Sequence, residues 1–271
     1  FIEIDQLRAY ADKYSLDAVR WYLMTQGPLG ATDSDFAHSR FIEVYNADLA
    51  NGIGNSTSRV SNMIDKYFGG EVPDAEGRFN LDLLTSQSIT KTVNEQLSSK
   101  GSGKQFEDIL HVYDWPDRII AREMNWFPEY IDDCMLDYSL RCGMKLVSEV
   151  DSYIGLTRPF SIAKDLDGEP IFEGLTNHQA LATILYHCAE ALRIASLFLY
   201  PAMPEKMAEL WRRWNCEHLN DPADANSGFR APLAELARFG DGAHSLKPGQ
   251  KIVKGEALFM RADPKDEPPG A

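Results

Sequence analysis

The chain has 271 residues, of which 44% are hydrophobic, and 27 lysine and arginine residues stand against 41 aspartate and glutamate residues, for a formal net charge of -14. This apolar content excludes a disordered chain, and the longest apolar stretch, residues 189–204, is too polar for a membrane span because it contains Glu190 and Arg193. The excess of acid argues against a generic coat for nucleic acid, since non-specific binding depends on basic side chains that neutralise phosphates.

Two short helices are predicted at the start of the chain. Apolar residues recur at intervals of three and four from Asp5 to Tyr14 and again from Leu16 to Leu23, and Ser15 between them is a suitable N-cap. Residues 26–35 contain the turn-forming residues glycine, proline and aspartate, so we expect a loop there. The sequence starts within an element and shows no signal peptide, and we expect it to be a fragment.

A long helix is predicted from Ser39 to Phe68, where Gly69 and Gly70 close it. Gly52 and Gly54 lie inside this helix, and each glycine costs about 1 kcal/mol relative to alanine. Both glycines make sense if another backbone packs against the helix there, or if the helix bends.

Three more helices are predicted by periodicity, at residues 130–154, 177–199 and 205–214. Residues 244–261 contain short apolar runs of strand type after a Lys-Pro-Gly-Gln turn, and the proline-rich tail, residues 263–271, is expected to be loose. The expected fold class is therefore all-α, an antiparallel helical bundle with a small extended C-terminal appendix.

Catalytic and metal-binding patterns are scarce. The six histidines form no HxxxH or HExxH pair, no GxSxG motif occurs, and the four cysteines are too far apart for a zinc knuckle or a dense disulfide framework. Asp132 and Asp133 are expected to be solvated residues near a helix start, and His187 and Cys188 to be packed on an apolar helix face. We expect no catalytic residue and no metal site, and the cysteine usage favours a reducing, cytoplasmic setting.

The middle of the long helix carries polar residues at a regular interval. Asn51, Asn55 and Arg59 are spaced i, i+4, i+8, which places them on one ridge of a straight helix. Asparagine offers a donor and an acceptor and arginine offers a fork of donors, so the ridge could read the edge of an unstacked base. On spacing alone, an equally good interpretation is that these side chains satisfy buried polar groups between helices.

Several motifs resemble one known family. The run Asn46 to Arg59 is similar to N-A-D-L-A-N-x-x-G-N-x-x-x-R in the C-terminal part of methionyl-tRNA synthetases. Weaker similarities to the same family lie at residues 14–23, 33–36, 158–164 and 256–261. The resemblance implies an anticodon-binding helical domain of the class I synthetase type.

The resemblance also implies which residues contact RNA. Asn55 and Arg59 would contact the first anticodon base, a cytosine, and Phe160 would stack on it. Phe160 stands where the family has tryptophan, so a stacking face is kept but the indole N–H donor is lost. The supporting RNA contacts are expected to come from Asn51, Arg158 and Lys164. Recognition of splayed loop bases by edge contacts and stacking is the usual mode of sequence-specific RNA binding.

The family's HIGH and KMSKS signatures do not occur in this chain. The resemblance therefore implies a parent methionine–tRNA ligase whose missing catalytic domain uses ATP and Mg and packs against this part. The chain itself is expected to bind methionine-specific tRNA with a CAU anticodon, to hold no cofactor, and to lack aminoacylation activity. Neither DNA nor a membrane is expected as a partner. The alternatives are the anticodon-binding bundle of another class I synthetase, or a helical protein-interaction module.

The expected domain organisation has three parts. Residues 1–35 would be connecting helices downstream of the catalytic domain, residues 36–243 the anticodon-binding domain, and residues 244–271 an extended C-terminal segment with a loose tail. Residues 85–126 resemble nothing in the family and are expected to be an insertion. The excess of acid is not uniform, because basic side chains exceed acidic ones in residues 49–68. We therefore expect the net negative charge to make RNA binding by the isolated chain weak, but not to abolish it.

Overall fold

Helices dominate the described part of the chain. The computed structural model describes residues 2–27, 36–75, 117–171, 175–216, 219, 229–240 and 242–270. The helices are α1 (Ile4–Tyr14), α2 (Leu16–Gln26), α3 (His38–Val44), the π-helical η1 (Tyr45–Gly54), α4 (Asn55–Phe68), α8 (Asp117–Asp132), α9 (Leu136–Thr157), α10 (Pro159–Ile162), α11 (Asn177–Leu199), α12 (Pro204–Arg213) and α13 (Leu233–Leu236). No strand forms among these residues, although Glu71 and Lys251 make an isolated antiparallel bridge. The all-α prediction is confirmed.

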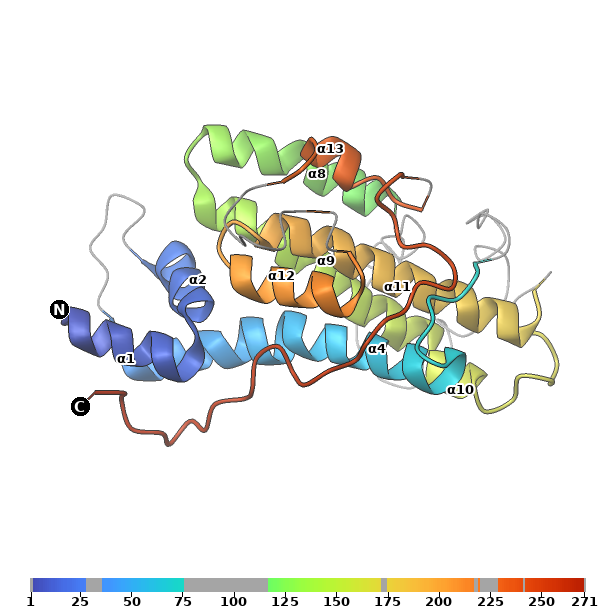
Figure 1. Cartoon of the computed structure of the whole chain (residues 1–271), viewed down its shortest axis with the longest axis horizontal. Helices are drawn as coiled ribbons and strands as arrows, with labels where there is room; N and C mark the ends of the chain where they lie inside the picture. The colour runs from blue at the N-terminus through green and yellow to red at the C-terminus, as the bar shows by residue number, and fades with distance from the viewer. Residues whose placement is uncertain are drawn as a thin grey trace, which may run out of the picture.

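The central element of the bundle is α11, which runs beside α9 (Figure 1). Its length and composition would suit a membrane span, but its apolar window is wholly buried inside the bundle, which accounts for that composition. Its predicted bounds are confirmed. The start is fixed by a capping box, in which the Thr176 hydroxyl accepts from the Gln179 N–H and the Gln179 side chain accepts from the Thr176 N–H.

The predicted long helix is instead three successive segments, α3, η1 and α4. The chain bends at Gly52, whose ψ of -113° is not helical. A Cβ atom there would lie 2.9 Å from Met144 Cε on α9, and one at Gly54 would lie 2.8 Å from the Leu49 carbonyl oxygen. The bend is therefore confirmed, whereas the closest neighbours of the two glycines are a methionine side chain of α9 and a carbonyl oxygen of η1 itself, not another backbone. Gly69 closes α4 with a φ of 62°, as predicted.

The predicted helix from about Tyr130 to Ile154 is confirmed as α9, but its predicted start is wrong. The chain turns between α8 and α9 at Cys134, which has a positive φ of 57°. Asp132 is therefore the last residue of α8 and Asp133 follows it, so the two aspartates lie at a helix end and not at a helix start as expected. Residues 117–126, the end of the expected insertion, lie in α8, where Ile119 and Ile120 are buried. Residues 85–116 lie outside the described residues.

The first two helices match the prediction. Ser15 separates α1 from α2, and its side chain accepts a hydrogen bond of 3.2 Å from the Ala18 N–H. Asp17, in the first turn of α2, is fully buried and accepts a 2.7 Å hydrogen bond from the Lys206 N–H in the first turn of α12. The N-terminal helix pair is thereby joined to a helix from the other end of the chain.

The C-terminal segment, residues 242–270, runs in an extended course along the bundle and ends near α1 (Figure 1). The buried Asn46 side chain exchanges two hydrogen bonds with the Ala262 backbone, at 3.0 and 2.9 Å. Asp266 forms a 3.0 Å ion pair with Lys13, and its carbonyl oxygen lies 2.8 Å from Nε2 of His38. The prediction of a loose tail is therefore wrong up to Gly270.

A fully buried ion pair on α11 fixes the region before that segment. Arg193 forms two bonds to Glu190, of 2.8 Å from Nε and 2.7 Å from Nη2, and Nη1 donates to the Leu236 carbonyl oxygen at 2.7 Å. Glu190 in turn accepts from the Leu246 N–H at 3.0 Å. The charged pair thus forms hydrogen bonds with the backbone of Leu236 and of Leu246, and so holds both segments against α11.

Candidate RNA-binding site

Asn55 and Arg59 lie one turn apart on α4, and the structure leaves both accessible. Asn55 is exposed, and the Arg59 side chain is 39% exposed. Arg59 Nη1 donates to Asp151 Oδ1 on α9 at 2.8 Å, and the Ser56 hydroxyl donates to the other Asp151 oxygen at 2.9 Å. Nη2 and Nε of Arg59 have no hydrogen-bond partner among the described residues. The guanidinium is therefore oriented by α9 while part of its fork of donors faces outward.

Asn51 does not continue this ridge. It is exposed, but it belongs to η1, on the other side of the bend at Gly52 from Asn55. The predicted i, i+4, i+8 alignment assumed a straight α-helix, and the π-helical stretch and the bend change the turn angle between residues 51 and 55. The α-helical spacing therefore joins only Asn55 and Arg59.

Phe160 lies on α10, a single turn that follows directly on α9. Arg158 joins the two helices in a left-handed conformation, with a φ of 48°. Pro159 and Ile162 on the same turn are buried and anchor it, whereas Phe160 is 44% exposed. Arg158 and Lys164, on either side of this turn, are exposed. An aromatic face and two cations therefore share this corner of the bundle.

The start of α11 supports the loop after α10. The buried Asn177 side chain donates to the carbonyl oxygens of Asp165 and Glu169, at 2.8 and 3.2 Å, and accepts from the Ile171 N–H at 3.0 Å. The ring of its neighbour His178 packs at a tilt against Phe68 at the end of α4, with ring centroids 5.3 Å apart. Both the α4 side and the α10 side of the candidate site are thus anchored on α11.

Sequence reasoning missed Asp151 and Asn177, which orient the two parts of the site. Asp151 lies six residues before the end of α9, or roughly 9 Å along the helix axis from the residue that precedes Arg158. An aspartate and an asparagine on helices give no signal of these roles, because their partners lie elsewhere in the fold. The structure thereby joins Ser56 and Arg59 of α4 through one carboxylate of α9.

The buried ionisable groups have a packing role. Burial lowers the pKa of His187 to about 4 and raises the pKa of Cys188. Both residues are buried on α11, as predicted. Among the residues that the structure describes, no three histidine, cysteine, aspartate or glutamate side chains are grouped to hold a metal ion.

Sequence comparison identifies related proteins. Residues 3–61 match the family model for tRNA synthetases class I (M). The methionine–tRNA ligase of Caldanaerobacter subterraneus subsp. tengcongensis is 29% identical over 257 residues, which cover 94% of this chain and 31% of that protein. The methionine–tRNA ligase of Streptomyces coelicolor is 30% identical over 254 residues, which cover 93% of this chain and 38% of that protein.

Solved structures agree in fold. The crystal structure of the apo form of Mycobacterium tuberculosis methionyl-tRNA synthetase matches 95% of this chain and 41% of that chain, with a TM-score of 0.64 and 19% sequence identity. The chain spans about a third of the length of the curated relatives that it matches. Over nearly its whole length this chain is therefore homologous to part of methionine–tRNA ligases, and its first helices match the class I tRNA synthetase family model.

Proposed function

We propose that this chain recognises the CAU anticodon loop of methionine-specific tRNA as part of a methionine–tRNA ligase. The names of its relatives support the parent activity. The observation that carries the local proposal is the Arg59 guanidinium, which Asp151 holds by one nitrogen beside the exposed Asn55. A guanidinium that is fixed at one end and open at the other is prepared for a directional contact with a base edge.

The proposed contacts use complementary chemistry. A cytosine edge presents an amino donor together with ring-nitrogen and carbonyl acceptors. Asn55 can accept from the amino group and Arg59 can donate to the acceptors. Phe160 offers a face on which the base stacks, with Arg158 and Lys164 nearby for backbone phosphates. Asn51 would contact the loop from beyond the bend.

The remaining roles follow from the parent enzyme. A catalytic domain that binds ATP and Mg would charge the tRNA with methionine and would pack against this chain in the cytoplasm. Residues 1–35 would connect the two, residues 36–243 would bind the anticodon arm, and residues 244–271 would strap the bundle. With a net charge of -14, the isolated chain is expected to bind tRNA weakly, because it lacks a general attraction for phosphates.

Replacing Arg59 by alanine is expected to weaken binding of a CAU stem-loop by about 1 to 3 kcal/mol and to leave binding of an unrelated stem-loop nearly unchanged. The reason is the loss of base-edge donors. Its partly exposed ion pair with Asp151 contributes only about 0 to 1 kcal/mol to stability, so the fold should survive. Fluorescence anisotropy with the two labelled RNAs, together with thermal melts, measures both effects.

Lys66→Ala is the matched control for Arg59→Ala. Lys66 is an exposed cation on the same helix, and its removal changes the net charge by the same amount. Lys66→Ala should weaken binding of both stem-loops slightly and equally. Equal losses on both RNAs in Arg59→Ala would reduce Arg59 to a phosphate contact and contradict base reading.

Phe160 should act through its ring. Phe160→Ala is expected to weaken binding of the CAU stem-loop by about 1 to 3 kcal/mol, and Phe160→Trp to keep or improve it, because stacking depends on aromatic area. Phe160 is exposed while Pro159 and Ile162 anchor the turn, so neither change should unfold α10. The same anisotropy titration tests this, and normal binding by Phe160→Ala would remove the stacking role.

A further inference from the structure

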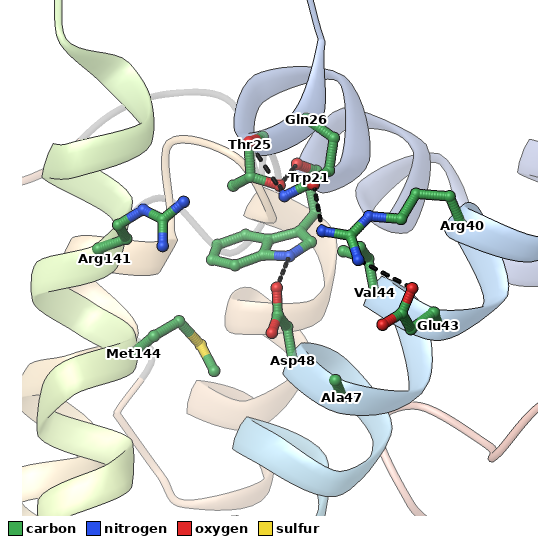
Figure 2. Close-up of a pocket in the computed structure, with 10 residues that line it drawn as sticks. All are labelled: Trp21, Thr25, Gln26, Arg40, Glu43, Val44, Ala47, Asp48, Arg141 and Met144. Atoms are coloured by element: carbon green, nitrogen blue, oxygen red, sulfur yellow. Dashed lines mark hydrogen bonds and ion pairs between the residues drawn. The ribbon is translucent and has the colours of Figure 1, made fainter. Parts of the chain in front are cut away.

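A separate polar cavity of about 300 Å³ lies where α2, the α3–η1 junction and α9 meet (Figure 2). This volume is at the lower end of the range for small-molecule sites, about 300 to 1,000 Å³. It lies away from Phe160 and Arg59, neither of which lines it. The lining residues are Trp21, Thr25, Gln26, Arg40, Glu43, Val44, Ala47, Asp48, Arg141 and Met144.

Asp48 is the unusual member of this lining. One oxygen, Oδ2, accepts from the Trp21 indole N–H at 3.0 Å, and burial raises the pKa of the carboxyl group. Among the described residues, Asp48 forms no ion pair. Arg40 is already held by Glu43 and by Gln26, each at 2.8 Å. A partly buried carboxylate therefore lines the cavity without a direct ion pair, and the charges of Arg141 and Arg40 only partly counter the effect of burial on its pKa.

Arg141 is the complementary group. Figure 2 shows its guanidinium on the α9 side of the cavity, facing the Trp21 indole and Asp48. Its side chain is 62% exposed, and its contact with Asp137, at 3.8 Å, is a long ion pair. The Met144 side chain lies one turn further along α9, below both Arg141 and the indole in the same view. The cavity thus offers one carboxylate without a direct ion pair, one weakly paired cation and an apolar wall.

We propose that this cavity binds a small α-amino acid with an apolar side chain. The ammonium group would donate to Asp48, the carboxylate would accept from Arg141, and the side chain would contact Trp21 and Met144. A ligand with two opposite charges matches the lining, in which Arg40 and Arg141 balance Glu43 and Asp48. A phosphate group would meet the two carboxylates, and a simple amine would leave Arg141 unused.

The test measures separately how much the ammonium group and the carboxylate of the ligand contribute to binding. Isothermal titration of the whole 271-residue chain would use L-leucine, isopentylamine, which lacks the carboxylate, and 4-methylpentanoate, which lacks the ammonium group. L-leucine should bind saturably, and each analogue should bind roughly tenfold more weakly or worse, since each loses a charge-assisted hydrogen bond. No saturable binding of L-leucine, or equal binding of either analogue, would overturn the proposal.

Two variants assign the contacts. Asp48→Asn keeps an oxygen for the Trp21 indole, and Arg141→Gln removes an exposed charge, so both should fold, as circular dichroism can check. Each should bind L-leucine roughly tenfold more weakly. In Arg141→Gln, L-leucine and isopentylamine should become similar. The control Lys145→Gln removes a neighbouring cation of α9 outside the cavity and should bind like the wild type; a loss there equal to that of Arg141→Gln would contradict the assignment.

Discussion

Replacing Arg193 by methionine is expected to lower the free energy of unfolding by about 3 to 5 kcal/mol. The substitution would leave the Glu190 carboxylate fully buried without its cation and would remove a donor from the Leu236 carbonyl oxygen. A buried charge without a partner is costly because it loses its hydration and gains nothing in return. Urea unfolding followed by circular dichroism at neutral pH measures the change.

The control for this substitution is Lys145→Met. Lys145 also pairs with a glutamate on its own helix, Glu149, but its side chain is 50% exposed, so the expected loss is only about 0 to 1 kcal/mol. The double variant Glu190→Leu, Arg193→Met removes both buried charges and should lose less than Arg193→Met alone. An Arg193→Met protein as stable as the Lys145→Met protein would mean that the buried pair is not the anchor of this region.

Asp17→Asn is expected to change how stability depends on pH. Burial raises the pKa of Asp17 from 3.8 to about 6, against the lowering effects of the Lys206 N–H and Arg20. The folded state therefore holds this proton more tightly than the unfolded state, and the contribution of Asp17 to wild-type stability should fall as pH rises from about 4 to about 6. At about 1.4 kcal/mol for each pKa unit, the loss is on the order of 3 kcal/mol.

The asparagine variant lacks this titration but keeps an oxygen for the Lys206 N–H. Its free energy of unfolding minus that of the wild type should therefore increase by about 3 kcal/mol between pH 4 and pH 6 and stay level above pH 6. Urea unfolding of both proteins at several pH values gives this difference directly. A difference that stays flat, or that decreases with pH, would contradict a raised pKa for Asp17.

Local patterns predicted much of the fold because their causes lie within a few residues. The helix α11 begins at its capping box, α2 begins after Ser15, and α12 begins at Pro204, and each signal is visible in the sequence. The bend at Gly52 was only suggested, since the Met144 side chain that fills the space comes from α9. The turn at Cys134 was missed because apolar residues continue on both sides of it.

The sequence predicted which residues of the candidate site are exposed, but it did not predict which residues hold them in place. The exposure of Asn55 and Phe160 agrees with the roles that the sequence suggested. Arg59 is oriented by Asp151, which is 92 residues away in the chain, and no spacing rule links them. The sequence left two interpretations of Arg59 equally good, contact with a base edge and a polar contact between helices. In the structure Arg59 connects α4 to α9 through Asp151, and its remaining donors stay available for a ligand.

Asn46 holds Ala262 across 216 residues of sequence, and His38 contacts Asp266 across 228. Contacts of such long sequence separation close large loops and form late, after local helices exist. On a ribosome, Ala262 and Asp266 emerge long after Asn46 and His38. Asn46 therefore stays without this partner while the helices between them form, and the arrival of residues 262–266 closes this part of the bundle surface.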